Sequence, residues 1–352
     1  MFGKSNGIIA VADIGSASAG FAVIDASGKG SATVLAAERA ILPLEERNRE
    51  QTMSGVVRML SDAGGQVLKK YANSAIGRQR GTPGEVYAVI RAPWTRASAG
   101  HAERLLEKEM IISKDMITSV AQQALEKDTE LDRANMLDTC VIRVELNEYP
   151  TGKPLGKRAH RLGVITFESD CDPIFKKQIV DTLTMLLPGR EPRLRSGARA
   201  YLTVAQEELH HPSAYVIIDM VSEATTCMAV RDGIITHHAI IPEGVRTIIR
   251  RIAGEKGMSE EMLNLMRMVV ADSCSGEACD ALNTALAKVE PDLVRIFGEA
   301  VGGFVGKTRL PDTLIVTAHP DITPWLGHVF SRIDFAQFTV TMDGGAGYEQ
   351  WL

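Results

Sequence analysis

Two stretches of the chain share one pattern of apolar runs and polar turns. The stretch Ile8–Asp25 (IIAVADIGSASAGFAVID) consists of an apolar run, an Asp-x-Gly-Ser turn and a second apolar run. It predicts two antiparallel strands, because Gly15 permits turn conformations that are closed to other residues. The pattern recurs at 215–235 (YVIIDMVSEATTCMAVRDGII), where one apolar strand ends in Asp219 and the next is closed by Asp232 and Gly233. The sequence therefore predicts two acidic hairpins of the same design.

Between the two hairpins the apolar spacing alternates between helix and strand. A strand is expected at 31–41, and apolar residues at intervals of three and four between Arg49 and Tyr71 predict a helix with one buried face. The basic, glycine-containing segment 75–84 is expected to be a loop, and 85–92 (EVYAVIRA) a buried strand. Strands followed by a helix and another strand are typical of a layered α/β domain.

Residues 96–187 follow a different pattern, which predicts an inserted unit that projects as a separate lobe. Its expected elements are a helix over 116–130 capped by Ser113, strands at 139–149 and 161–168, and a helix at 173–187. Beyond the insert we expect helices at 196–209, 244–253, 259–273, 278–303 and 325–331, strands at 313–317 and 338–342, and a flexible tail over 344–352.

Composition excludes several classes of protein. With 352 residues, 45% hydrophobic and 24% charged, the chain is expected to be globular, with more than one packed unit. No run approaches the roughly 18 apolar residues of a membrane span, and the first residues lack the apolar core of a signal peptide, so the expected location is cytoplasmic. A net charge of −5 and scattered basic residues argue against nucleic-acid binding. The five cysteines form no paired Cys-x-x-Cys pattern and are expected to be reduced core thiols.

Two further patterns fail as chemical motifs. Residues 302–308 (GGFVGKT) have three residues between the glycine and Gly-Lys-Thr where a phosphate-binding P-loop needs four, so a helix-ending glycine cluster is favoured. The pairs His210-His211 and His237-His238 are adjacent in sequence. Neighbours in a strand point to opposite faces, so neither pair predicts a metal site with two ligands.

The two acidic hairpins resemble the phosphate-binding hairpins of the actin-like ATPases, and within them the chain resembles the FtsA/PilM type. The resemblance rests on ADIGSAS at 12–18 and on 217–253, in which Asp219, Arg231–Gly233 and Ile241–Gly244 match the family's order of motifs. It covers nearly the whole chain. That family carries a small strand-helix-strand-strand insert at this location, and VELNEYPTGKPLGKRAHRLGVITFES looks like its central hairpin.

The resemblance implies a fold and a domain division. The expected fold class is α/β, an actin-like (ribonuclease-H-like) two-lobed fold with a small inserted subdomain. Residues 1–95 and 188–352 would form the core, with the second lobe over about 215–352, and residues 96–187 would form the insert.

The resemblance also implies a site for ATP with Mg²⁺ between the lobes. Asp13 and Asp219 would order the metal through its bound water, although a turn aspartate also commonly bonds its own backbone. Gly15, Ser16 and Ser18 would donate N–H groups and hydroxyls to phosphate. The other implied ligand contacts are Ser222, Thr225, Thr226, Gly244, Ala318 and His319.

Three departures from the family pattern weaken this site. Val221 and Val245 stand where relatives have glycine, and a β-branched side chain fills space that a phosphate needs. Ala318 and His319 replace the family's Gly-Gly. His319 could stack on a base, although a loop histidine beside proline is more typical of solvated surface. We therefore expect at most a weak ATPase, with a pseudo-ATPase as the alternative.

The function implied by the resemblance is that of a cytoplasmic actin homologue of the FtsA type. Such a protein polymerises and links an inner-membrane machine to cytoplasmic partners in cell division, and the expected partners are a second copy and the tubulin-like division protein. The alternative is a PilM-like type IV pilus scaffold with a pilus inner-membrane partner, favoured by the lack of a terminal amphipathic helix and hence of an evident membrane anchor. A small-molecule kinase is disfavoured, because no catalytic carboxylate stands out and the insert is small.

Overall fold

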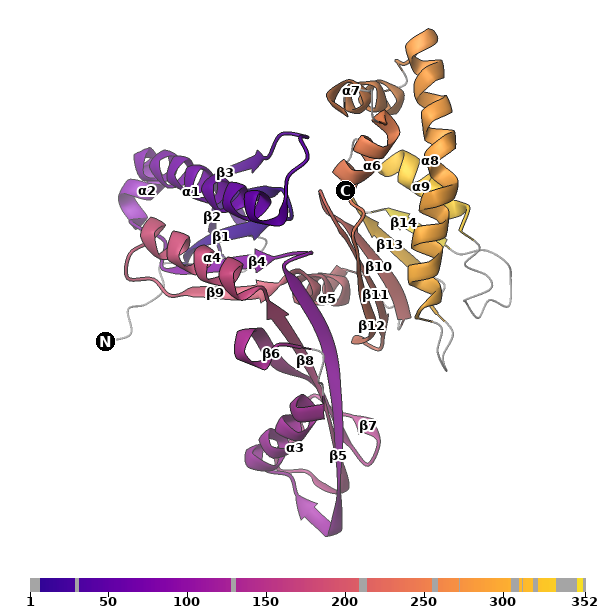
Figure 1. Cartoon of the computed structure of the whole chain (residues 1–352). Coiled ribbons are helices and arrows are strands. Elements are labelled where there is room, and N and C mark those ends of the chain that lie inside the picture. The colour runs from indigo at the N-terminus through magenta and orange to yellow at the C-terminus, as the bar shows by residue number, and fades with distance from the viewer. Residues whose placement is uncertain are drawn as a thin grey trace.

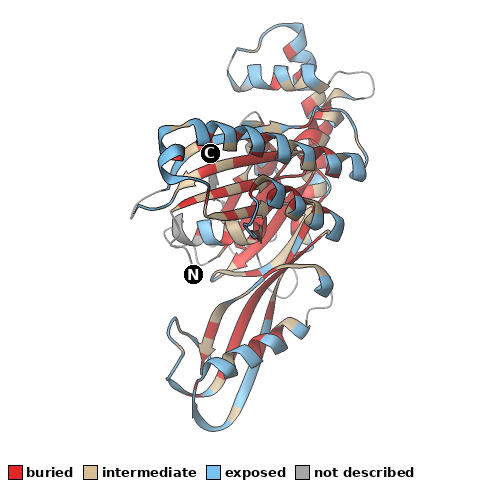
Figure 2. Cartoon of the chain, turned by 90° about the vertical axis from the view of Figure 1, so that its left-hand side faces the viewer, coloured by how far each residue is buried: buried red, intermediate tan, exposed pale blue. Residues whose placement is uncertain are grey.

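Two lobes stand side by side, and a third unit extends away from them (Figure 1). The computed structural model describes residues 7–28, 32–127, 131–208, 214–254, 259–271, 273–304, 310–311, 313–318, 322–333 and 347–350. Within these residues the strands form three sheets. Figure 2 shows that the strands are largely buried, whereas the outer faces of the helices are exposed.

The first lobe is a five-stranded sheet covered by helices. Its strand order is β3-β2-β1-β4-β9. Residues of β1 alternate between buried and half-buried, as a strand with one face in the core requires. The elements are β1 (Ile8–Ile14), β2 (Ser18–Asp25), β3 (Thr33–Ile41), β4 (Glu85–Ile90), β9 (Pro192–Ser196), α1 (Arg49–Asn73), α2 (Ala75–Arg80) and α4 (Pro173–Leu186).

Helix α1 begins at a capping box. The Asn48 side chain accepts a hydrogen bond from the N–H of Gln51 at 2.8 Å, and the Gln51 side chain accepts one from the N–H of Asn48 at 3.1 Å. Val56, Leu60 and Val67 recur at helical spacing and lie in the core of the first lobe. The predicted amphipathic helix is therefore present, with its apolar face on the sheet.

The second lobe repeats the design of the first. Its strand order is β12-β11-β10-β13-β14, an antiparallel meander followed by parallel strands, as in the first sheet. Alternate residues of β10 enter two different apolar clusters, one beneath α6–α9 and one beneath α5. The elements are α5 (Gly197–Glu208), β10 (Ala214–Met220), β11 (Thr225–Arg231), β12 (Ile234–Ile241), α6 (Val245–Ala253), α7 (Ser259–Val270), α8 (Glu277–Gly302), β13 (Thr313–Thr317), α9 (Thr323–Ser331) and β14 (Gly347–Gln350).

The inserted unit has its own sheet and its own apolar cluster. The sheet order is β5-β8-β6-β7, and α3 packs on it through Val120 and Ala124. At its base, Ala97 and Phe167 join the cluster beneath α5, so the insert also packs against the second lobe. The elements are β5 (Thr95–Ile111), α3 (Lys114–Lys127), a 3-10 turn (Arg133–Asn135), β6 (Met136–Leu146), β7 (Tyr149–Pro150) and β8 (Arg158–Cys171).

The buried face of helix α4 packs in the core of the first lobe. Its buried residues Phe175, Ile179 and Leu183 lie in the core of the first sheet. Trp94, which stacks on Phe175 with ring centroids 4.2 Å apart, belongs to the same core. We therefore propose that the inserted subdomain ends at Cys171 and not at Leu187.

The structure corrects two sequence-based element predictions and adds two strands that were not predicted. Residues 75–80 form α2 instead of a loop, because the hydroxyl of Ser74 accepts a hydrogen bond from the N–H of Gly77 at 3.0 Å and caps a short helix. Strands β5 and β9 were not expected, since their sequences are too polar to stand out. Residues 347–350 form β14 beside β13 instead of a flexible tail, whereas the strand expected at 338–342 lies outside the described residues.

The cysteines differ in part from the expectation of reduced core thiols. Cys274, which precedes α8, forms a disulfide with Cys279 in the first turn of α8. Cys140, Cys171 and Cys227 are thiols, and burial raises the pKa of Cys171 and Cys227 to about 12, so both stay protonated. None of the helices described is long and apolar enough to cross a membrane.

Candidate functional site

The turns of the two acidic hairpins meet at the interface of the lobes. The hydroxyl of Ser16, in the first turn, accepts a hydrogen bond at 2.7 Å from the N–H of Glu223 in the second. Beside this contact lies a cavity of about 470 Å³ lined by both lobes. Its size suits a small organic ligand. Of the residues expected at the site, Ser18, Ser222 and Ala318 line this cavity.

Asp13 is paired with an arginine through the register of the first sheet. Asp13 on β1 lies opposite Gly20 on β2, and Gly20 lies opposite Arg39 on β3. A Cβ on Gly20 would lie 3.0 Å from the Arg39 Nη2 atom. Because glycine has no side chain, the Arg39 guanidinium can extend across β2 to Asp13. Arg39 donates a hydrogen bond to the Asp13 carboxylate and another to the Ser18 hydroxyl at 3.3 Å. The carboxylate expected to order Mg²⁺ therefore already has a cationic partner.

Arg91 joins the aspartates of both hairpins. It follows β4, and its N–H donates to the carbonyl of Ile14 at 2.9 Å, which fixes the backbone beside the first turn. Its guanidinium donates to Asp219 at 2.6 Å from Nη2 and 3.3 Å from Nε, and its Nη1 lies 3.7 Å from the Asp13 Oδ2 atom. Burial alone would lower the pKa of Arg91, but the charges of Asp219 and Asp13 raise it above its ordinary value. The arginine is therefore a fixed cation between the lobes.

The Asp219 carboxylate is buried and fully engaged. Its residue is 1% exposed. Besides Arg91, the Tyr201 hydroxyl and the Thr317 hydroxyl each donate to its Oδ1 atom at 2.7 Å. Burial, followed by the charge of Asp219, raises the pKa of Tyr201, which keeps that hydroxyl a donor. Asp219 therefore belongs to a satisfied interlobe network.

The side chains around the two aspartates do not resemble a divalent-cation site. Magnesium sites present carboxylate oxygens and waters to the metal, whereas here guanidinium groups lie against both candidate carboxylates. Among the residues that the structure describes, no cluster of three His, Cys, Asp or Glu side chains could hold a metal ion. The ordering of Mg²⁺ by Asp13 and Asp219 stays a prediction, and the side chains as placed do not favour it.

Most other residues expected at the site use their polar groups within the protein. The N–H of Gly15 donates to the carbonyl of Ser18 at 2.9 Å, and its carbonyl accepts from the Trp94 indole at 2.9 Å. The Thr225 hydroxyl donates to the carbonyl of Glu243 at 2.5 Å. Thr226 is 6% exposed and does not line the cavity.

Of the remaining two expected contacts, the structure describes Gly244, which lies beside the second turn. Gly244 caps the start of α6, where the N–H groups of Val245 and Arg246 donate to the carbonyls of Val221 and Ser222 at 3.0 and 2.8 Å. These bonds use two of the N–H groups that a helix start could offer to phosphate. His319 lies outside the described residues.

Sequence reasoning missed the arginines of the cavity. Arg39, Arg91, Arg246 and Arg267 all line it. The one signal available was Gly20, since a glycine inside a strand often marks a close approach by another group. Arg91 and Asp219 are 128 residues apart, and nothing local in the sequence indicates their pairing.

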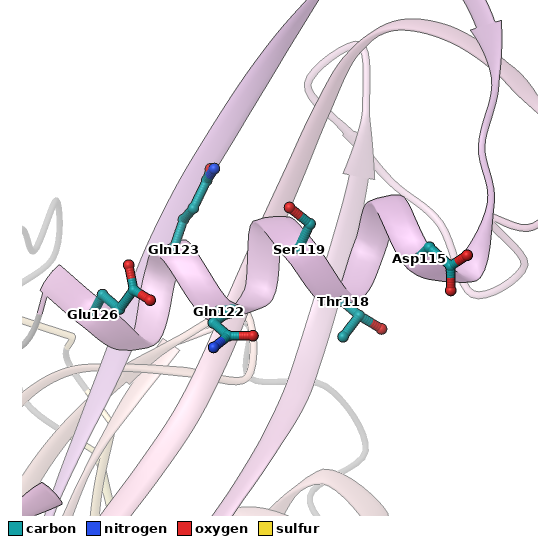
Figure 3. Close-up of a pocket in the computed structure, with 6 residues that line it drawn as sticks. All are labelled: Asp115, Thr118, Ser119, Gln122, Gln123 and Glu126. Atoms are coloured by element: carbon teal, nitrogen blue, oxygen red, sulfur yellow. The ribbon is translucent and has the colours of Figure 1, made fainter.

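A second hollow lies on the outer face of α3 and does not form a chemical site. Figure 3 shows its six residues, which all come from this one helix. Their side chains project outward from the helix and do not converge on one point. They are Asp115, Thr118, Ser119, Gln122, Gln123 and Glu126. The hollow is therefore the solvated face of an amphipathic helix.

The strand neighbours His237 and His238 do not act as a pair. The His237 ring stacks on Phe304 with centroids 5.5 Å apart. Burial lowers the pKa of His238 to about 4, which the charge of Asp170 only partly opposes. His238 is therefore a neutral, partly buried ring, as expected from its place in a strand.

Stability should fall in acid because of His238. The unfolded chain takes up the proton near pH 6.5 and the folded chain only near pH 4, so the contribution is present above pH 6.5 and is lost as pH falls toward 4. When the pH is lowered from 7.5 to 5, the free energy of unfolding should fall in both proteins. The fall should be about 1–2 kcal/mol smaller in His238→Gln than in the unaltered chain, because the variant lacks the titrating ring. Urea unfolding of both proteins at the two pH values measures this difference, and equal losses would contradict the assignment.

Two lobes of matching topology, a site between their hairpins and an inserted strand-helix-strand-strand unit define the actin-like ATPase fold, which confirms the expected fold class. A chain of the PilM-PilN type IV pilus biogenesis complex is similar with a TM-score of 0.55 and 12% identity, over 92% of this chain and 85% of that chain. The ethanolamine utilization protein EutJ from Carboxydothermus hydrogenoformans has a TM-score of 0.47 and 12% identity, over 92% and 81%. No protein-family model and no curated protein matches the sequence.

Proposed function

We propose that this chain is a cytoplasmic actin-fold scaffold of the FtsA/PilM type that does not turn over ATP. The observation that carries the proposal is the Arg91 bridge between Asp13 and Asp219. Phosphoryl transfer needs a divalent cation on the phosphates and a residue that orients the attacking water. Arginine stays protonated and cannot act as a base, and here it stands against both candidate carboxylates. The site is therefore suited to holding the lobes together and poorly suited to hydrolysis.

A scaffold acts through its protein partners, and the insert is our proposed contact surface. Large apolar side chains that are exposed on it include Leu105, Ile111, Tyr149 and Leu155. Leu105 is 78% and Tyr149 76% exposed, so both side chains are accessible to a partner. We propose self-association through the insert and attachment to the inner membrane through a partner protein.

The partner class has two alternatives. In the FtsA-type function the partner is the tubulin-like division protein. In the alternative it is a pilus inner-membrane protein, by analogy with the PilM-PilN type IV pilus biogenesis complex, to which the fold is similar. Co-sedimentation of the purified chain with each partner class distinguishes the two.

The purified chain should release no phosphate from ATP and should self-associate. We expect phosphate release with Mg²⁺ to equal the buffer blank, and the sedimentation coefficient to rise with protein concentration. Leu105→Asp should suppress that rise, because it places a charge in the contact. Met185→Asp is the matched control, since Met185 is 72% exposed but lies on α4 outside the insert. Turnover near 1 s⁻¹, the low end of about 1–100 s⁻¹ for kinases, would contradict the scaffold function.

A further inference from the structure

We propose that the Cys274–Cys279 disulfide is a redox-responsive site, which a dithiol reductant opens in the folded chain, and that its reduction loosens helix α7. The other three cysteines are thiols, so the chain carries one oxidised pair among reduced residues. The inference rests on the proposed function only for the cytoplasmic location. Disulfides are rare in the cytoplasm, and those that form there are usually transient or redox-sensing.

The oxidised pair is the cysteine site that a reagent reaches most easily in the folded chain. Cys274 is half-buried, whereas its partner Cys279 is 5% exposed. Of the thiols, Cys171 and Cys227 are buried. Access is one of the factors that set the rate of thiol–disulfide exchange. We therefore expect a reductant to attack the Sγ atom of Cys274.

The exchange is a two-electron reduction of the pair. A thiolate of the reductant attacks Cys274 and forms a new S–S bond to it, and the bond between the two cysteines breaks with its electron pair on the Cys279 sulfur. The second thiol of the reductant then displaces Cys274. The chain ends with two thiols, which hold the two protons that the reductant has lost, and the reductant ends as a disulfide. Oxidised glutathione reverses the reaction and is released as two molecules of glutathione.

The disulfide constrains a helix start that has no side-chain cap. The N-cap residue of α8 is Gly276, which has no side chain to accept a hydrogen bond from the first turn. The N–H groups of Cys279 and Asp280 donate to the carbonyl of Gly276 at 3.0 and 3.2 Å. The disulfide adds a covalent constraint in this same turn. Reduction removes that constraint and leaves the turn to its backbone hydrogen bonds.

Helix α7, which precedes the disulfide, packs on the second lobe over a narrow surface. Among the described side chains of this helix, Met266 is the one that is buried. Met268 and Val269, near its end, are exposed. A segment with few buried apolar contacts opens locally at a low cost in free energy. Because Cys274 follows α7 closely, its bond to α8 limits this opening in the oxidised chain.

The position of α7 gives its loosening a structural consequence. Glu260, Leu263 and Arg267 of this helix line the interlobe cavity, so α7 forms part of one wall of that cavity. Figure 1 shows α7 at the end of the second lobe that lies far from the insert. Reduction should therefore loosen the cavity wall and leave the surface of the insert unchanged.

Alkylation of the folded, full-length chain tests the exchange without any variant. We expect iodoacetamide to label Cys274 only after treatment with dithiothreitol, and oxidised glutathione to restore its protection. Cys171 and Cys227 are the internal controls and should stay unlabelled in both states, because they are buried. Mass spectrometry of the digested chain identifies each labelled residue. A pair that is reduced only in denaturant, or that stays open in oxidised glutathione, would overturn the inference.

Limited trypsin digestion measures the loosening of α7. Arg267 is exposed on this helix, but a protease cuts a helix only when the helix opens. We expect cleavage after Arg267 to be at least about 5-fold faster in the reduced chain, because a covalent constraint on the opening is lost. Cleavage after Lys177, which is exposed on α4, is the internal control and should keep its rate. Equal rates after Arg267 in the two states would overturn the coupling to α7.

Two variants separate the disulfide from other effects of the reductant. Cys274→Ser should be cleaved after Arg267 as fast as the reduced chain, and dithiothreitol should not change its rate further. Cys140→Ser is the matched control, since Cys140 is a thiol on β6, and it should keep both the protection and the response to reductant. A response to reductant that persists in Cys274→Ser would contradict the assignment to this pair.

These results are independent of the scaffold function. Self-association and partner binding are measured separately, so an unreactive disulfide leaves the scaffold function standing. Conversely, a chain that responds to reductant as expected, but stays monomeric and binds neither partner class, would contradict the scaffold function alone.

Discussion

Arg91→Met should lower the free energy of unfolding by about 3–5 kcal/mol, the range for breaking a buried ion pair by removing one partner. The side chain of Asp219 is 2% exposed, and Arg91 is its one cationic partner among the ion pairs described. Tyr201 and Thr317 still donate hydrogen bonds to Asp219 in the variant, but hydroxyls do not balance its charge. Urea-induced unfolding of the variant and the unaltered chain at pH 7 measures the loss.

Two further variants identify the source of that loss. The double variant Arg91→Met with Asp219→Asn should recover much of the stability, because no uncompensated buried charge remains. Arg193→Met removes an arginine of greater exposure from its pair with Glu85, which should cost at most about 1 kcal/mol. A loss of similar size for Arg91→Met and Arg193→Met would show that the interlobe bridge does not stabilise the fold.

The hairpins and main helices could be predicted because their signals are local. Apolar alternation in β1, the Gly15 turn and the capping box at Asn48 each act over a few residues. The same is true of α4, where Asp172 caps the helix and Pro173 occupies its first turn. Local patterning therefore determined the order of these elements along the chain.

Elements and contacts that depend on distant partners could not be predicted. Strand β5 is 17 residues long, but its outer half is mostly exposed and polar, so its sequence lacks apolar alternation. It is a strand because it pairs along nearly its whole length with β8. The packing of α4 on α1 is likewise a distant contact, since α1 lies about 100 residues earlier in the chain.

The sequence did not predict the cationic partners of the two hairpin aspartates. The two aspartates lie at the interlobe interface as the hairpin motif implies, yet their partners are Arg39 and Arg91. The Arg39 contact depends on the register of three strands, and the Arg91 contact on the packing of two lobes. Neither property is encoded in a short motif, so the motif alone could not indicate these two arginine contacts.

Gly244→Ala should lower the free energy of unfolding by about 2–3 kcal/mol, the usual cost of forcing an extra group into a close-packed region. A Cβ at this position would lie 2.5 Å from the backbone N of Ala224 and from the carbonyl oxygen of Val221. Backbone atoms cannot rotate away as a flexible side chain can, so the second hairpin turn and α6 must move apart. That shift would stretch the bonds from Val245 and Arg246 to the turn carbonyls.

Gly65→Ala is the control for this prediction and should change the free energy of unfolding in the opposite direction. Gly65 lies within α1, and nothing comes within 4 Å of a Cβ built there. Alanine at such a helical position should raise the unfolding free energy by about 0.5–1 kcal/mol. Equal stability of the two variants would show that Gly244 is not held against the second turn.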